Sequence, residues 1–238
     1  MPAKRSTTIP AARSATRAAA AGRPAAATPR RAASTARRPA RSARAAGPDR
    51  ATRTLISQPW LHQKGVEIQD FGTVREFPIG LPQDVRMYSC ERLNQTLADT
   101  QILYALYKKH HWLMRGATFY QLHLLLDKHA GEQLELIDQI AERVQTLGGV
   151  AIGDPRHVAQ ITVIPRPPDG VEEVPAMLSR LLEAHEMILT DAHDAAARTA
   201  ERGDDGTNDL LVSDVIRTGE MEAWFLAEHL VDTPLVHA

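Results

Sequence analysis

Two pairs of potential metal ligands occur along one stretch of the sequence. His123 is followed four residues later by Asp127, and Asp138 is followed four residues later by Glu142. Residues four apart share one face of a helix, and the 11-residue step from Asp127 to Asp138 is close to three whole turns. The four side chains are therefore expected along one stripe of a helix. Imidazole and carboxylate ligands without a thiolate suit Fe(II), Mn(II) or Zn(II).

The separation of the two pairs prevents one chain from closing a site with all four side chains. Eleven helical residues rise about 16 Å, whereas ligand atoms lie about 2.0–2.2 Å from a metal. Two such helices packed antiparallel about a two-fold axis would set His123 and Asp127 of one subunit against Asp138 and Glu142 of the other. The spacing thus predicts an intersubunit metal site, although histidine and acid pairs are also common on solvent-facing helices.

Apolar residues at three- and four-residue steps predict four helices that position these side chains. The first begins at about residue 85 and ends at the turn 114–116. The second covers roughly 31 residues, or about 46 Å, and is closed by Gly148-Gly149. A third helix is expected over about 172–202 and a fourth over 207–230.

The connections between these helices predict the topology. Residues 152–170 contain Pro155, Pro165, Pro167 and Pro168, which exclude an uninterrupted helix. About 20 residues can extend about 65 Å, enough to run the length of the bundle. The other two connections are short and predict antiparallel hairpins. We therefore predict an all-α fold with a ferritin-like four-helix bundle over 85–230 and one long crossover between the second and third helices.

The sequence resembles the Dps family of mini-ferritins across residues 85–230. The segment His111-Trp112-Leu113-Met114-Arg115-Gly116, then Phe119, His123 and Asp127, then Asp138 and Glu142, resembles the family signature in residue type and spacing. The resemblance implies ferroxidase centres between two-fold-related subunits, with His111, His123 and Asp127 from one chain and Asp138 and Glu142 from its mate. It also implies a hollow homo-oligomer, expected to be a dodecamer, that oxidises Fe(II) preferentially with H2O2. Such a cage would store the ferric mineral and protect DNA.

Other di-iron bundles hold their metals inside one bundle with Glu-x-x-His motifs. No histidine of this sequence has a Glu three residues before it, which favours the intersubunit arrangement. The remaining histidines of the expected helices have no second ligand at a matching position of the signature, and we expect them to be packing or surface residues: His110, His129, His185, His193 and His229.

The turn at residues 203–209 resembles the family segment whose acids line three-fold pores that admit cations. This resemblance makes Asp204 and Asp209 candidate pore residues. The alternative is a purely structural role, because Asp, Gly, Thr and Asn are also the residues that a turn and a helix N-terminus prefer.

Charge is divided unevenly along the chain. Residues 1–50 hold 12 Lys and Arg against one acid, and the remaining 188 hold 16 against 28, so net charges of +11 and −12 share one chain. Residues 1–53 contain almost no large apolar side chain and are interrupted by prolines. Such a segment cannot offset the entropy cost of ordering, so a disordered basic arm is predicted. We predict that residues 54–84 form an irregular strap that packs on the bundle and that residues 231–238 form a short C-terminal tail.

A basic arm repeated on every subunit of a cage is expected to bind DNA through phosphates, without reading sequence. The arginines expected to carry this binding are Arg13, Arg17, Arg23, Arg30, Arg31, Arg37, Arg38, Arg41 and Arg44. Two alternatives remain for the arm, because organelle transit peptides have a similar composition and charged tails can merely improve solubility.

The remaining composition bears on the cellular setting. No run of 18 apolar residues occurs, and the lone Cys90 cannot form an intramolecular disulfide, so a cytoplasmic, nucleoid-associated protein without a membrane partner is expected. Three functions stay open: a ferroxidase and iron store that binds DNA, a nucleoid-packing protein with an incidental metal site, and a storage cage without a DNA role.

Overall fold

The computed structural model describes residues 60–61 and 65–231, so the arm over 1–53 and nearly all of the tail lie outside the described residues. Every regular element in the described part is a helix, which confirms the all-α prediction. The first three long helices are α1 (Gln83–Leu113), α2 (Phe119–Thr146) and α4 (Val174–Glu201). The fourth consists of α5 (Asp205–Leu210), η2 (Leu211–Ile216) and α6 (Arg217–Glu228), which follow one another without a gap.

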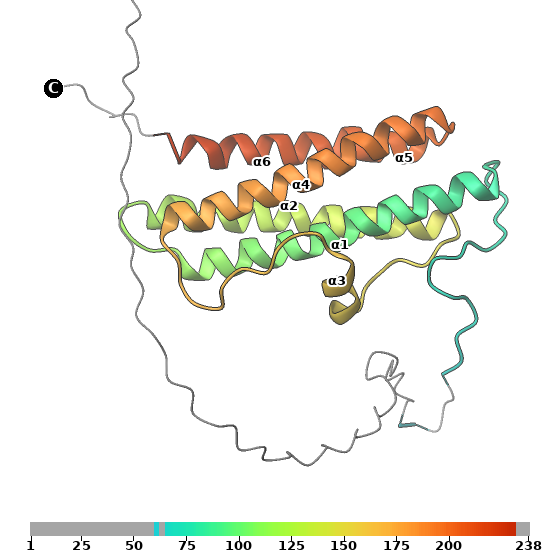
Figure 1. Cartoon of the computed structure of the whole chain (residues 1–238), viewed down its shortest axis with the longest axis horizontal. Helices are drawn as coiled ribbons and strands as arrows, with labels where there is room; N and C mark the ends of the chain where they lie inside the picture. The colour runs from blue at the N-terminus through green and yellow to red at the C-terminus, as the bar shows by residue number, and fades with distance from the viewer. Residues whose placement is uncertain (1–59, 62–64, 232–238) are drawn as a thin grey trace, which may run out of the picture. The chain divides into compact units, whose positions relative to one another are not determined.

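The long helices run side by side as a bundle around one apolar core (Figure 1). α1 packs on α2 and on α4, and α4 packs on the fourth helix. Leu93, Leu97, Leu126 and Leu181 from the first three helices have no exposed surface. Burial of a leucine side chain contributes roughly 1.5–3 kcal/mol, so these residues fix the helices against one another.

Glycines in left-handed conformations end the first two helices. Gly116 has φ +88° in the turn after α1, and this turn sends α2 back along α1 as an antiparallel hairpin. Gly148 has φ +82° after α2, and the N–H of Gly149 donates to the carbonyl of Val144 at 3.0 Å. This closure ends α2 at Thr146, which makes the helix 28 residues long, slightly shorter than expected.

The crossover between α2 and α4 is long, as expected, and it includes a short helix that the proline-rich composition had hidden. This helix, α3 (Pro155–Ile161), packs on α1. The Asp154 side chain accepts a hydrogen bond from the Arg156 N–H, and Pro155 occupies the first turn. An Asp cap followed by Pro is a helix-start signal that is visible in the sequence.

Hydrogen bonds from Gln69, Arg75 and Arg86 attach the segment before α1 to the end of α2. The N–H of Arg75 donates to the Gly148 carbonyl at 2.9 Å, and the Gln69 side chain donates to the same oxygen. The buried guanidinium of Arg86 donates to the carbonyls of Arg75 and Leu147 at 2.7 and 3.0 Å. These bonds hold the segment against the bundle at the far end of α2 from the His123 position.

Candidate metal centre

The turn between α1 and α2 brings the first three predicted ligands together. His111 lies near the end of α1, and His123 and Asp127 lie in the first turns of α2. The two imidazole rings stack with centroids 3.7 Å apart and planes at 19°. Nε2 of His111 lies 4.0 Å from Oδ1 of Asp127. One imidazole from each helix and one carboxylate, which are three of the five predicted ligands, therefore lie together.

Each of the two histidines orients the other through the backbone. Nδ1 of His111 lies 2.7 Å from the His123 carbonyl oxygen, and Nδ1 of His123 lies 3.0 Å from the His111 carbonyl oxygen. A carbonyl oxygen only accepts, so both Nδ1 atoms carry the proton and both Nε2 atoms keep their lone pair in the neutral ring. Backbone bonds of this kind fix the tautomer and direction of metal-binding histidines.

Asp127 is held by a cation that the sequence patterns had not singled out. Lys108 on α1 donates to Oδ1 of Asp127 at 2.6 Å. This hydrogen bond lowers the pKa of Asp127 below its usual value, so the side chain is a carboxylate at neutral pH. Lys108 precedes His111 by three residues, so both lie on one helix face. This spacing could have indicated from the sequence that Lys108 lies near the candidate ligands. A metal ion bound by Asp127 would compete with the ammonium group.

Asp138 and Glu142 lie further along α2, and both are exposed. Neither carboxylate has a hydrogen bond or ion pair with any other described residue. The rise of a helix separates Asp138 from Asp127 by about 16 Å and Glu142 from Asp127 by about 22 Å. Among the described residues of one chain, no group of three or more His, Cys, Asp or Glu side chains is arranged to hold a metal ion. The two halves of the predicted ligand set therefore do not meet within one subunit.

Large apolar side chains are exposed around the histidine pair. Trp112, Tyr120 and Leu124 are 70, 68 and 49% exposed, and Phe119 stacks on His123 with centroids 5.0 Å apart. Several large apolar side chains exposed side by side are typical of a surface that binds another protein. This end of α1 and α2 therefore has the character of a surface that another subunit covers.

Asp204 does not fit the predicted pore-lining role, because its carboxylate is buried inside the subunit and only 1% exposed. Oδ1 accepts from the Arg143 guanidinium at 2.5 Å and from the Thr207 N–H, and Oδ2 accepts from the Ser89 hydroxyl at 2.6 Å. Burial by itself raises the pKa of Asp204, but these hydrogen bonds and the Arg143 charge leave it below the usual value. Asp204 caps α5 and joins three helices. The other pore candidate, Asp209, is exposed and remains a candidate.

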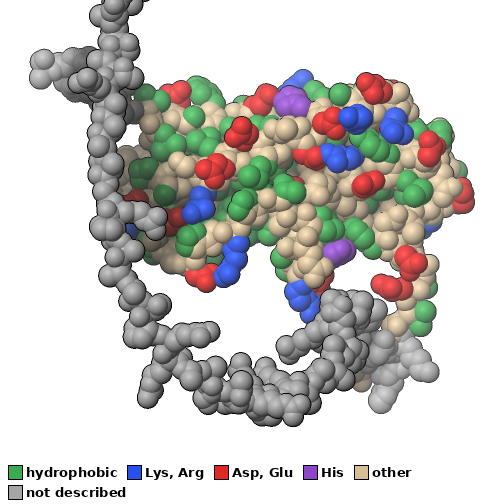
Figure 2. Space-filling view, in the orientation of Figure 1, with side chains coloured by type: hydrophobic (Ala, Val, Ile, Leu, Met, Phe, Trp, Pro, Cys, Tyr) green, Lys and Arg blue, Asp and Glu red, His purple; other side chains and the backbone are tan. Residues whose placement is uncertain are grey.

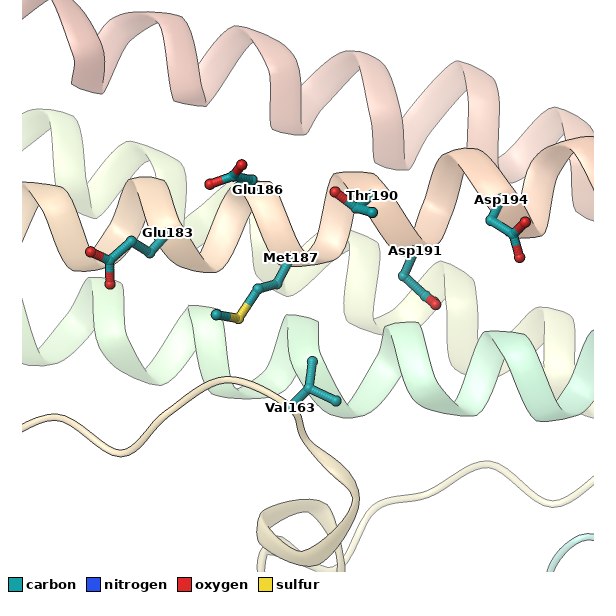
Figure 3. Close-up of a pocket in the computed structure, with 7 residues that line it drawn as sticks. All are labelled: Val163, Glu183, Glu186, Met187, Thr190, Asp191 and Asp194. Carbon is teal, nitrogen blue, oxygen red and sulfur yellow. The ribbon is translucent and has the colours of Figure 1, made fainter.

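The outer face of α4 carries a shallow groove that does not form a site. Glu183, Glu186, Asp191 and Asp194 line it along one helix, with Val163 from the crossover opposite. Figure 3 shows these carboxylates pointing in different directions rather than toward a common point. Figure 2 shows acidic, basic and apolar side chains mixed across the visible face of the bundle, without a continuous basic patch on that face. Among the described residues, no helix combines the length and apolar character needed to cross a membrane.

The fold is ferritin-like, and three of the five predicted ligands lie together where α1 ends and α2 begins. The ferritin-like domain family matches residues 90–236. A nutrient stress-induced DNA-binding protein of Synechococcus is 33% identical over 168 residues, covering 71% of this chain and 95% of that protein. An uncharacterised protein of Kitasatospora aureofaciens is 69% identical over 150 residues, covering 63% of this chain and all of that protein.

The chain is also similar to solved structures of Dps proteins. DpsC from Streptomyces coelicolor is 79% identical with a TM-score of 0.72, covering 72% of this chain and all of that one. The archaeal Dps homologue from Halobacterium salinarum is 27% identical with a TM-score of 0.69, covering 72% of this chain and 95% of that one. The chain belongs to the ferritin-like family and, within it, to the Dps proteins.

Proposed function

We propose that this protein is a Dps-type ferroxidase and iron-storage cage that also binds DNA. The observation that carries the proposal is the mutual orientation of His111 and His123, which leaves two Nε2 lone pairs beside the Asp127 carboxylate at an uncovered surface. Iron is the substrate. Its Fe(II) form accepts the mixed imidazole and carboxylate ligands that this surface offers.

The second half of each centre would come from another copy of the chain. Two α2 helices packed antiparallel about a two-fold axis would place Asp138 and Glu142 of one subunit opposite His123 and Asp127 of the other. The unpartnered carboxylates at one end of the stripe and the exposed apolar side chains at the other support this pairing. Two-fold symmetry generates two centres per dimer, and we propose that such dimers assemble into a closed dodecamer.

The reaction at each centre is oxidation of iron by peroxide. One H2O2 accepts two electrons, one from each of two Fe(II) ions, and its O–O bond breaks to yield two hydroxide equivalents and two Fe(III). A centre that holds two Fe(II) ions delivers both electrons together, so no hydroxyl radical is released. The Fe(III) then hydrolyses to the stored mineral. H2O2 is our proposed oxidant because a two-electron acceptor matches two metal ions held by two half-sites.

The basic arm is the proposed DNA-binding element. Nine of its arginines, from Arg13 to Arg44, offer charge that the visible face of the bundle in Figure 2 does not gather into one patch. Relatives include a protein named for DNA binding in Synechococcus and one named for DNA protection during starvation in Halobacterium salinarum. Many arms on one cage would bind phosphates multivalently and without sequence preference. Such a protein would work in the cytoplasm at the nucleoid.

The experiment combines both activities in one tube. Fe(II) oxidation by the purified full-length protein is followed with and without H2O2, and plasmid cleavage by hydroxyl radicals is then scored. We expect fast peroxide-dependent oxidation together with an intact plasmid. Oxidation no faster than the protein-free rate would refute the ferroxidase and leave a cage that packs DNA by charge alone. Oxidation without DNA binding would leave a storage cage.

A further inference from the structure

A second polar cluster lies inside the bundle, apart from the intersubunit centre. It contains one side chain from each long helix: Tyr107 from α1, His129 from α2, His185 from α4 and Glu222 from α6, each no more than 1% exposed. His129 and Asp127 are two residues apart on α2 and therefore point to opposite sides of the helix, one inward and one to the surface. The cluster and the predicted ferroxidase ligands are separate sites.

Glu222 is only partly compensated within this cluster, although the Tyr107 hydroxyl also interacts with it. Its Oε2 lies 3.2 Å from Nε2 of His185 and accepts a hydrogen bond from the Gln133 side chain at 3.0 Å. Its Oε1 has no hydrogen-bond partner, and no Lys or Arg of the described residues forms an ion pair with it. Burying a carboxylate without a full set of partners lowers the stability of the fold, and a bound cation would offset this cost.

His129 presents a second unused ligand atom to the same region. Its Nδ1 is buried and has no hydrogen-bond partner. The ring is held in place by edge contacts with Tyr107 and Phe225, with centroids at 5.4 and 6.1 Å. An oriented imidazole nitrogen without a partner is an available metal ligand.

A small cavity is lined by these two residues. Its volume is about 150 Å³, and its lining includes His129, Glu132 and Glu222, with Lys128 and Arg217 nearer the outside. Glu132 binds Lys128 through Oε1 at 2.5 Å, while its Oε2 has no partner. Three residues that line the cavity, from two helices, therefore each carry one buried oxygen or nitrogen without a hydrogen-bond partner.

The local backbone is also shaped for this cluster. The π-helical segment η2 immediately precedes α6, and such segments are frequent at functional sites. Gly219 lets α6 approach α4 closely, since a Cβ there would lie 3.0 Å from Leu189 Cδ2 and 3.6 Å from His185 Nδ1. The close approach sets Glu222 beside His185.

We propose that each subunit binds a divalent transition-metal cation in this cavity, with His129 Nδ1 and Glu222 Oε1 as its protein ligands and water completing the shell. Glu132 lies at the mouth, where its free oxygen would bind the ion on entry. Among the described residues, no group of three or more His, Cys, Asp or Glu side chains is arranged to hold a metal ion, so water would have to supply the remaining ligands. The site does not depend on the proposed ferroxidase, because it shares no residue with it.

Zinc is the probe, since it binds the same ligands without redox chemistry. Zinc binding by the chelator-treated full-length protein is measured by calorimetry for the wild type and for Glu222→Gln, His129→Gln and His123→Ala, with Glu228→Gln as the exposed control on the same helix. We expect Glu222→Gln and His129→Gln each to lose one zinc per subunit, and Glu228→Gln to lose none. His123→Ala should lose only zinc bound at the intersubunit centre, which separates the two sites.

Wild-type zinc stoichiometry and affinity in both Glu222→Gln and His129→Gln would overturn the proposal. If either variant fails to assemble, wild-type crystals soaked in zinc decide the question by anomalous scattering. A peak between His129 and Glu222 supports the site, and an empty cavity at full occupancy of the intersubunit centre rejects it.

Discussion

The imidazoles of His111 and His123 stack at 3.7 Å while each Nδ1 bonds the backbone carbonyl of the other residue. Loss of either ring therefore removes a ligand and also releases the second ring from its orientation. We expect His123→Ala to lower Fe(II) oxidation to the protein-free rate while the cage still assembles. Asp138→Ala should do the same, because it removes a ligand of the opposite half-site. Full activity in both variants would reject the ligand assignment.

Mixing these two inactive variants tests the intersubunit arrangement directly. In a dimer of one His123→Ala and one Asp138→Ala subunit, one centre carries both substitutions and the other carries neither. Random reassembly of equal amounts makes half of the dimers mixed, so about a quarter of the wild-type centres are restored. Reassembled cages should regain oxidation at about that level. No recovery after verified mixing would reject the pairing of His123 with Asp138 of another subunit.

Asp204 is expected to act on stability rather than on iron entry. Asp204→Ala removes the cap of α5 and leaves the partly buried Arg143 without its carboxylate, a loss of about 3–5 kcal/mol in the free energy of unfolding. Chemical denaturation measures the change. Asp205→Ala, on the exposed neighbour, is the matched control and should change stability little. Equal stability of the two variants would count against the structural role.

The same carboxylate predicts an acid dependence. The pKa of Asp204 is lower in the fold than in the unfolded chain, so its contribution is complete above the unfolded value and is lost as pH falls through the folded value. The stability difference between wild type and Asp204→Ala should shrink in strong acid. A difference that stays constant from neutral pH to pH about 2 would contradict this linkage.

His110 predicts a second pH dependence, at milder acidity. The ring is fully buried, neither nitrogen has a partner, and burial lowers its pKa from 6.5 to about 4. Between these values the unfolded chain binds the proton and the folded chain does not. Stability is therefore complete above pH about 6.5 and falls by about 3 kcal/mol per subunit as pH approaches 4.

Denaturation at fixed subunit concentration measures this loss for wild type and for His110→Leu, which fills a similar volume without titrating. The variant should lose less stability between pH 6.5 and 4. Identical pH slopes for the two proteins would show that His110 does not titrate as its burial implies.

Deletion of residues 1–50 should leave iron oxidation intact and abolish DNA binding at moderate salt, because it removes a net charge of +11. Gel shifts with linear DNA measure binding. Replacement by Lys of the nine arginines from Arg13 to Arg44 keeps the charge and should preserve the shift, whereas replacement of the same nine by Gln should remove it. Unchanged binding after deletion would move the DNA surface to the bundle.

The sequence by itself determined the periodic features. Apolar steps specified four helices and prolines specified the crossover, because both depend on local chain geometry. The spacing of the candidate ligands on α2 predicted, for the same reason, that one chain alone does not close a metal site. The α3 start signal at Asp154 and Pro155 was also present in the sequence, although the prolines around it obscured it.

Only the tertiary structure decided which side chains face each other. An Asp at position 204 could line a pore or cap a helix. The structure buries it against Ser89 and Arg143, which lie 115 and 61 residues away along the chain. The contacts of Lys108 with Asp127 and of Glu222 with His185 also join residues of different helices, so they too depend on how the helices pack. Residue spacing reports the geometry of one helix, whereas the partner and the dielectric around a charged group are set by the packing of several helices together.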